Sequence, residues 1–138
     1  MQWPRVSARA SHSYDAAAWL QTTARAELLS RLTLLRAQPR AILDLGAGTG
    51  LAAVAIKRRF RRASVTAVDV AAPMLEIARR AAASGGPFVA CRADARELPF
   101  EDASFDLVFS NMMLQWLVRP MRCSPRYVAC CGRAASCC

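Results

Sequence analysis

Several features are scarce in this chain of 138 residues, and each scarcity argues against a class of function. No apolar run reaches the length of about 18 residues that a membrane-spanning helix requires. The first residues, 1–13, lack the apolar segment of a secretory signal. We therefore expect a cytoplasmic protein with no membrane partner. The only histidine is His12, and no Ser-His-Asp grouping is apparent, so the sequence does not predict a catalytic triad.

Metal-ligand spacings are also missing, although the chain contains six cysteines. Five of them lie within the last 16 residues, in neither a C-x-x-C pattern nor a Cys/His zinc pattern. We expect no metal site. The sixth, Cys91, is the only one inside the recognisable domain, and we interpret it as a small buried thiol.

Lysine is nearly absent, because 18 arginines and one lysine supply all the side-chain positive charge. The formal net charge of +9 invites a nucleic-acid interpretation. The arginines are scattered among alanines, however, as a GC-rich coding sequence would produce, and we expect no nucleic-acid partner. One dense basic cluster spans residues 57–62 at the predicted end of a helix. It is either a solvated helix end, where cations complement the dipole, or a docking patch for an acidic partner.

The sequence I-L-D-L-G-A-G-T-G at residues 42–50 is the stretch on which the functional prediction depends. An apolar strand pattern precedes Gly46, Gly48 and Gly50, and a helical pattern begins at Leu51. Glycine tolerates positive φ angles and lets a ligand approach the backbone, and the helix N-terminus suits a polar or anionic ligand. A plain tight turn is the alternative.

Two common phosphate-binding patterns fail at this loop. The dinucleotide fingerprint G-x-G-x-x-G needs a glycine where Leu51 stands. A P-loop needs G-K-[ST] at its end, and Gly50 is followed by Leu51 and Ala52. The pattern D-x-G-x-G-x-G instead resembles the first motif of class I S-adenosylmethionine-dependent methyltransferases. That resemblance implies that the loop passes under the methionine part of S-adenosylmethionine.

Predicted strands and helices alternate along the chain, which indicates an α/β fold with a Rossmann-like parallel sheet and flanking helices. A first helix is expected from Asp15, with Asp15 as its N-cap. The predicted strands cover residues 41–45, 64–69, 88–91 and 105–110. The predicted helices cover residues 51–60 and 72–83, and a further helical stretch is expected from Asn111.

Polar residues follow the predicted strands, and in a parallel sheet these strand ends meet at one crevice. Asp69 comes 19 residues after Gly50, near the offset of about 20 at which an acid binds a ribose. The alternative for Asp69 is a cap for the next helix. Asp94 is placed to accept from an adenine amino group, with Ala95 donating a backbone N–H, unless Asp94 is a solvated loop acid. Asp44 either binds the cofactor's amino group or fixes the glycine turn.

The later motifs make the resemblance more specific over residues 40–118. They are V-T-A-V-D-V-A-A-P-M-L, A-D-A-R-E-L-P-F and S-F-D-L-V-F-S-N-M-M-L-Q-W-L, and the last adds Asn111 to the cofactor site. The segment S-N-x-x-L-Q-W-L is similar to two branches of the family: the malonyl-acyl-carrier-protein O-methyltransferase of biotin synthesis and trans-aconitate methyltransferase. The segment A-S-H-S-Y-D-A-A-A-W-L-Q favours the biotin branch.

That branch implies roles on the acceptor side of the crevice. Tyr14 becomes a candidate lid residue over the cofactor, or else an ordinary aromatic at a helix start. Gln115 and Trp116 are candidates to line the acceptor, although Trp116 could equally pack a short helix. The acceptor would be the ionised carboxylate of a malonyl thioester on its carrier protein, which needs no general base. We assign no catalytic residue.

Three interpretations remain. The chain is an O-methyltransferase of biotin synthesis, another small-acid methyltransferase, or a remnant that at most binds the cofactor. We divide it into a lead-in with a helix at 1–40, an incomplete methyltransferase core at 41–118, and an aberrant cysteine-rich tail at 119–138. The family continues after the fourth strand with further strands, so we expect that strand to be an unpaired edge, and a poorly stable chain with little turnover.

We interpret the tail as the product of a shifted reading frame, with a genuine cysteine-rich tail as the alternative. The string from Met121 to Cys138 has no helical or strand period. Codons can be chosen for it such that a frame one base back encodes an amphipathic helix, an R-P-G-G turn and an apolar strand, which is what the family has at this point.

Overall fold

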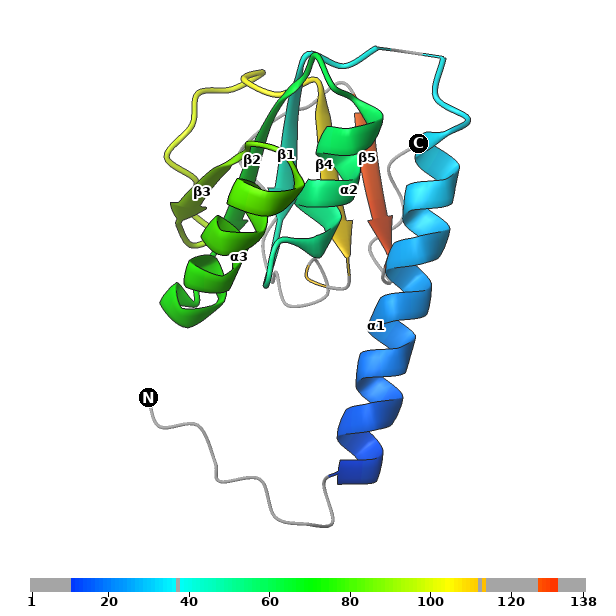
Figure 1. The fold of residues 1–138 in the computed structure, drawn as a ribbon. Helices are drawn as coiled ribbons and strands as arrows, with labels where there is room; N and C mark the ends of the chain where they lie inside the picture. Colours follow the sequence, from blue (N-terminus) through cyan, green and yellow to red (C-terminus); the bar gives the residue numbers. More distant parts are fainter. Residues whose placement is uncertain (1–10, 37, 112, 114–126, 132–138) are drawn as a thin grey trace.

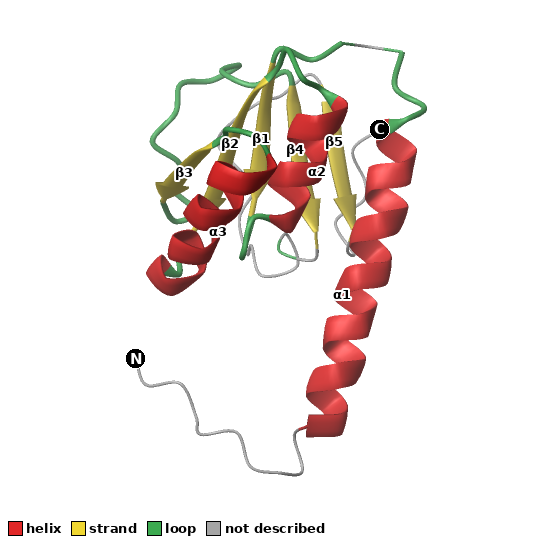
Figure 2. Cartoon of the chain, viewed as in Figure 1, coloured by secondary structure: helices red, strands yellow, loops and turns green. Residues whose placement is uncertain are grey.

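The computed structural model describes residues 11–36, 38–111, 113 and 127–131. Side chains are described for residues 19–36, 38–111 and 113. The described residues form three helices and five strands (Figures 1 and 2). In chain order they are α1 (Ser11–Leu32), β1 (Ala41–Leu45), α2 (Leu51–Arg59), β2 (Ser64–Asp69), α3 (Ala72–Gly85), β3 (Val89–Arg92), β4 (Leu107–Asn111) and β5 (Tyr127–Cys131).

The five strands form one parallel sheet in the order β3-β2-β1-β4-β5, which confirms the α/β prediction. The strand order reverses at β1, because β2 and β3 lie on one side of it and β4 and β5 on the other. Register pairs Asp44 of β1 with Ala67 of β2 and with Phe109 of β4. The loop between β1 and α2, residues 46–50, is called the glycine loop. The carboxyl ends of β1, β2 and β4 therefore meet beside the glycine loop, where parallel sheets place their ligands.

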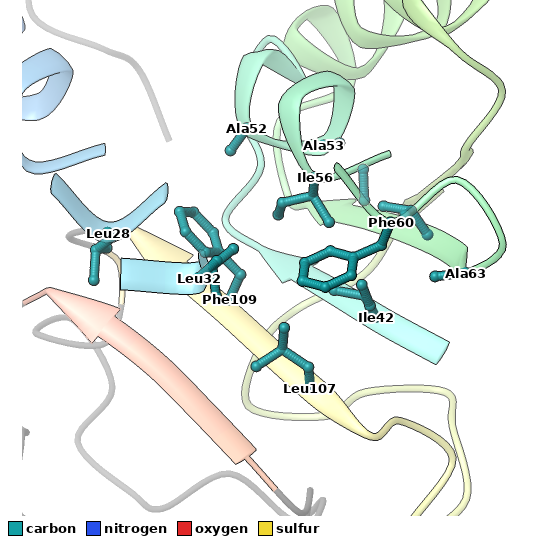
Figure 3. Close-up of a cluster of buried hydrophobic side chains, with 12 residues drawn as sticks. Leu28, Leu32, Ile42, Ala52, Ala53, Ile56, Phe60, Ala63, Leu107 and Phe109 are labelled. Atoms are coloured by element: carbon teal, nitrogen blue, oxygen red, sulfur yellow. The ribbon is translucent and has the colours of Figure 1, made fainter. Parts of the chain in front are cut away.

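One face of the sheet is covered by α1 and α2 and carries the larger apolar core (Figure 3). The central strands contribute Ile42, Leu107 and Phe109, all at most 1% exposed. Leu32 of α1 and Ile56 of α2 pack onto them. This layer fixes α2, and so fixes the loop from which α2 begins.

The opposite face carries a second cluster around Leu43, Leu45 and Val108. In the described part of the chain no helix covers it. Leu98 and Phe100 pack against it from the loop after β3, and Met113 packs against it from beyond β4. The loop that follows β3 is thus tied to the same central strands as the glycine loop.

Helix α1 differs from its prediction at its start and in its packing. It begins at Ser11, so Asp15 lies inside the helix, and the predicted N-cap at Asp15 is wrong. Leu28 and Leu32 are buried, whereas Leu20, nearer the start of the helix, is exposed. The N-terminal part of α1 extends past the carboxyl ends of the strands (Figure 1). Within the described ranges, no helix has the length and apolarity needed to cross a bilayer.

Four strand assignments need correction. The fourth strand, β4, begins at Leu107, two residues later than predicted. Asn111 is the last residue of β4 and does not begin a helix, because it continues the pairing with β5. The third strand runs from Val89 to Arg92, one residue later than predicted. Residues 127–131, in the tail expected to lack strand structure, form β5 beside β4. The prediction that β4 is an unpaired edge is therefore wrong. The segment Y-V-A-C-C is apolar and contains β-formers, which suits a strand.

Candidate functional site

The glycine loop is anchored to the neighbouring strand by its backbone. The N–H groups of Gly46 and Ala47 both donate to the carbonyl of Val68 on β2, each at 2.9 Å. Gly46, Gly48 and Gly50 have φ angles of 75°, 55° and 78°. These angles lie in the left-handed region that side chains disfavour, so the sequence motif follows from the path of the backbone.

The three glycines face different surroundings. A Cβ atom on Gly46 would lie 2.5 Å from the Met113 side chain, and one on Gly50 would lie 2.9 Å from Phe88. Those two glycines therefore allow close packing within the protein. A Cβ atom on Gly48 would meet nothing within 4 Å. Of the three, Gly48 is the one whose backbone borders open space, as expected where a ligand approaches.

The Asp69 carboxylate lies at the end of β2 and holds two segments together. Its Oδ2 atom accepts the Gly48 N–H at 2.8 Å, and its Oδ1 atom accepts the Ala71 N–H at 2.9 Å at the start of α3. Asp69 does not cap α3, because the N-cap of that helix is Ala71 and has no side-chain hydrogen bond; the second contact of Asp69 fixes the turn that leads into the helix. A carboxylate offers about four acceptor positions, so with respect to the described residues each oxygen keeps one position for a further donor. Two hydroxyl groups on adjacent carbons match that spacing.

A cavity of about 600 Å³ opens beside Asp69 at the carboxyl ends of β1, β2 and β3. Its lining brings together residues from the glycine loop, the end of β2 and the loop after β3. These are Leu45, Gly46, Val68, Asp69, Val70, Ala93, Asp94, Ala95, Arg96 and Met113. Four predicted site residues, Gly46, Asp69, Asp94 and Ala95, thus lie around one space. Val70, Arg96 and Met113 were not predicted.

Arg96 closes onto Asp94 across a tight turn. The backbone N–H of Arg96 donates to Asp94 Oδ1 at 2.9 Å. Its Nε atom lies 3.0 Å from Oδ1 and 3.1 Å from Oδ2, and a terminal guanidinium nitrogen lies 2.5 Å from Oδ2. The side-chain hydrogen bonds from Arg96, followed by its backbone N–H, lower the pKa of Asp94 to about 2. The carboxylate is thus ionised and already occupied.

Asp44 is buried beneath the glycine loop, with 1% of its surface exposed. Burial raises the pKa of Asp44 from its usual 3.8 to about 7. The Ala53 backbone N–H lowers the pKa, the Asp69 charge raises it and the Arg25 charge lowers it. Within the described part of the chain, its Oδ2 atom has no hydrogen-bond partner. A buried acceptor without a donor is rare and suits a ligand that supplies one.

Asn111 extends the polar edge onto β4. Its Nδ2 atom donates to the Gln21 carbonyl of α1 at 3.0 Å, while its Oδ1 atom is buried and lacks a partner among the described residues. The Ser110 hydroxyl beside it is also buried and also lacks a hydrogen-bond partner among the described residues. Together with Asp44, these groups place three oxygens that are unpaired among the described residues at the ends of the two central strands.

Three predicted acceptor-side residues cannot be placed. Tyr14 lies in α1, but its side chain is outside the described set, and Gln115 and Trp116 fall outside the described residues altogether. Their roles stay predictions. Cys91 is half-buried and packs against the second apolar cluster, as a small thiol of β3.

The basic cluster at residues 57–62 lies at the far end of α2 from the glycine loop (Figure 1). Lys57 donates to the carbonyls of Arg61 and Ala63 at 3.2 Å and 2.7 Å. Arg58 donates to the Gly85 carbonyl at 3.3 Å. These contacts favour the helix-end interpretation. An acidic partner bound there would be separated from the cavity by the length of α2.

Comparison with known proteins identifies the family. A family model described as a methyltransferase domain matches residues 42–133. This chain belongs to the methyltransferase domain family. The match begins at the glycine loop and includes Asp44, Asp69 and Asn111.

Relatives of this methyltransferase domain share its sequence over most of the chain. A malonyl-[acyl-carrier protein] O-methyltransferase of Xylella fastidiosa is 47% identical over 82% of this chain and 39% of the relative. One of Halorhodospira halophila is 50% identical over 75% of this chain and 35% of the relative. The chain thus spans less than half the length of these curated relatives.

A solved structure supports the fold of the methyltransferase domain. The apo form of the S-adenosylmethionine-dependent methyltransferase SibL superposes with a TM-score of 0.57 at 27% identity. The match covers 72% of this chain and 28% of that one.

Proposed function

We propose that this methyltransferase domain binds S-adenosylmethionine in the cavity beside Asp69 and transfers its methyl group to a carboxylate. The observation that carries the proposal is the Asp69 carboxylate. Backbone N–H groups of Gly48 and Ala71 hold it in place at 2.8 Å and 2.9 Å, and one acceptor position stays open on each oxygen. The cis hydroxyls of a ribose supply two donors at that spacing.

The remaining residues fit the other parts of the cofactor. The loop after β3 places Asp94 and Ala95 in the lining of the cavity, where an adenine edge would pair with a carboxylate that Arg96 has released and with a backbone N–H. Asp44 Oδ2 and Asn111 Oδ1 are buried oxygens without donors in the described part of the chain. An ammonium group would supply those donors, and its charge would favour ionised Asp44.

The reaction asks little of the protein beyond orientation. Bound S-adenosylmethionine supplies an electrophilic methyl group on a sulfonium that is its own leaving group. A carboxylate acceptor is ionised at neutral pH, so the chain has to hold the two reactants in line and need not remove a proton. Orientation of this kind contributes as much as about 7–11 kcal/mol to lowering a barrier.

The acceptor that we propose is the free carboxylate of a malonyl group on acyl-carrier protein. The support comes from the names of relatives that are 47% and 50% identical to this chain. The carrier would approach the carboxyl ends of the strands, where the cavity opens. A cytoplasmic location follows from such an acceptor. Another small acid such as trans-aconitate, or cofactor binding without turnover, would be the competing outcome.

The first experiment separates cofactor binding from methyl transfer. Calorimetric titration with S-adenosylhomocysteine measures binding, and mass spectrometry of malonyl-acyl-carrier protein detects the added methyl group. Free trans-aconitate serves as the competing acceptor. Methylation of the carrier-bound malonyl group supports the full proposal. Binding without methylation of either acceptor would leave a cofactor-binding remnant, and absence of binding would reject the cavity assignment.

The chain offers a matched pair of variants for the binding test. Asp106 resembles Asp69, because its Oδ2 atom accepts two backbone N–H groups, from Arg40 at 2.7 Å and Ala41 at 3.0 Å. It lies at the amino end of β1, away from the cavity. Asp69→Asn and Asp106→Asn should both reduce thermal stability. Only Asp69→Asn should also weaken S-adenosylhomocysteine binding, by roughly 1–3 kcal/mol, because it leaves a ribose hydroxyl unpaired.

A further inference from the structure

The two acids at the cavity are occupied to different degrees. A carboxylate has about four acceptor positions. Asp69 uses two of them for backbone N–H groups and keeps one on each oxygen. Asp94 receives four contacts from three N–H groups of Arg96: the backbone N–H, the Nε–H shared between both carboxylate oxygens, and a terminal N–H. The guanidinium thus engages both oxygens of Asp94, and an adenine amino group would have to compete with it.

We propose that Arg96 is a positioning residue that holds the Asp94 carboxylate, the acceptor at the adenine end of the cavity, in the cofactor-free protein. The incoming adenine amino group binds Asp94 in exchange for the Arg96 guanidinium. This inference rests on the proposed function, since it concerns the same cavity. It makes cofactor affinity depend on an ion pair that the bound state does not contain.

The Arg96 side chain can leave Asp94 without a change in the backbone of the loop after β3. The Arg96 side chain is 71% exposed and that of Asp94 is 39% exposed, so the released guanidinium enters water. The turn itself is held separately, because Asp94 and Glu97 form a bridge in which the Glu97 N–H donates to the Asp94 carbonyl at 3.0 Å. Asp94 can thus change partners without movement of its loop.

The test measures S-adenosylhomocysteine affinity at low salt and at about 1 M salt, where the Debye length falls to about 3 Å. This ligand carries no net charge, so the overall charge of the protein affects its binding little. At low salt, Arg96→Gln should bind about two- to fivefold more tightly than the natural protein, the range for loss of an exposed ion pair. High salt should raise the affinity of the natural protein toward that of Arg96→Gln.

Arg79→Gln is the matched control, because Arg79 and Glu76 form an ion pair of the same 2.5 Å separation on α3, and neither residue lines the cavity. It should leave affinity and salt dependence unchanged. A second comparison uses adenosine and purine riboside, which lacks the exocyclic amino group, in NMR titrations. Arg96→Gln should improve binding of adenosine and leave that of purine riboside unchanged.

The outcomes distinguish this inference from the proposed function. Equal or weaker binding of S-adenosylhomocysteine by Arg96→Gln, or an equal gain for both nucleosides, overturns the exchange while the cavity assignment stands. If neither the natural protein nor Arg96→Gln binds S-adenosylhomocysteine or adenosine at any salt concentration, the proposed function fails, and the exchange fails with it.

Discussion

Asp44→Asn should stabilise the fold at alkaline pH, because it removes a carboxylate that burial disfavours. The folded protein holds the Asp44 proton up to a pKa of about 7, whereas the unfolded chain releases it near 3.8. Between those values the folded state binds more protons, so stability falls as pH rises through this window. The full shift of about three pH units corresponds to roughly 4 kcal/mol above pH 7.

The pH dependence is more informative than the size of the change at any single pH. Linkage gives a difference in the Asp44→Asn effect between pH 5 and pH 8 of roughly 2–3 kcal/mol. The cost of an unpaired Asn amide, about 1–3 kcal/mol, is the same at both pH values and cancels. Urea denaturation of both proteins at pH 5, 6, 7 and 8 measures the difference. Asp44→Asn should gain steadily over the natural protein as pH increases.

Ser110→Ala is the control, because Ser110 is equally buried and unpartnered among the described residues but does not titrate in this range. Its effect on the free energy of unfolding should be independent of pH. An Asp44→Asn effect that is equally flat would refute the raised pKa. The same variant should weaken S-adenosylhomocysteine binding at pH 8, because an ammonium group loses its ionised partner. A substitution that raises stability while it weakens ligand binding is typical of a residue in a functional site.

Three further predictions concern the loop, the first helix and the tail. Gly48→Ala and Gly48→Val both place a side chain at a φ of 55°. Gly48→Val should reduce S-adenosylhomocysteine affinity further than Gly48→Ala, because the valine branches extend into the open space beside this residue. Equal affinities of the two variants would contradict this. Asn111→Leu removes the hydrogen bond to Gln21, so α1 should be cut faster in limited proteolysis, at a cost of about 1 kcal/mol in stability. The nucleotide sequence one base back from Met121 should encode R-P-G-G and an apolar strand, and any other string would reject the frameshift.

The sequence predicted most accurately the elements with clear boundaries. Strands β1 and β2 have the predicted bounds, because Pro39 and Gly46 frame the first and Asp69 ends the second. The start of α1 was missed, since no capping residue precedes Ser11 at a recognisable position. The sequence predicts a helical stretch from Asn111, but pairing with β5, a long-range interaction, continues β4 through this residue.

The sequence predicts which acids lie at the candidate site, but not which of them already have hydrogen-bond partners or a shifted pKa. The sequence locates Asp69 and Asp94 at strand ends. It could not show that Asp69 keeps one acceptor position on each oxygen among the described residues, whereas Arg96 engages both oxygens of Asp94, because that depends on where Arg96 folds. An arginine two residues after an acid was the available signal. The pKa of Asp44 was also beyond the sequence, since it depends on the layers that bury the residue.

The position of β3 at the edge of the sheet has a consequence for hydrogen exchange. The proposed ribose and methionine ends of the cavity follow β2 and β1, which have neighbours on both sides, while the proposed adenine end follows β3, which has one neighbour among the described strands. Edge segments open locally at lower free energy than central ones. Amides at residues 89–97 should therefore exchange faster than those at 42–46 in the free protein. A bound adenosyl ligand should slow exchange most at residues 89–97. The side of the cavity formed by β1 and β2 would thus be rigid before binding, and the β3 side would become rigid on binding.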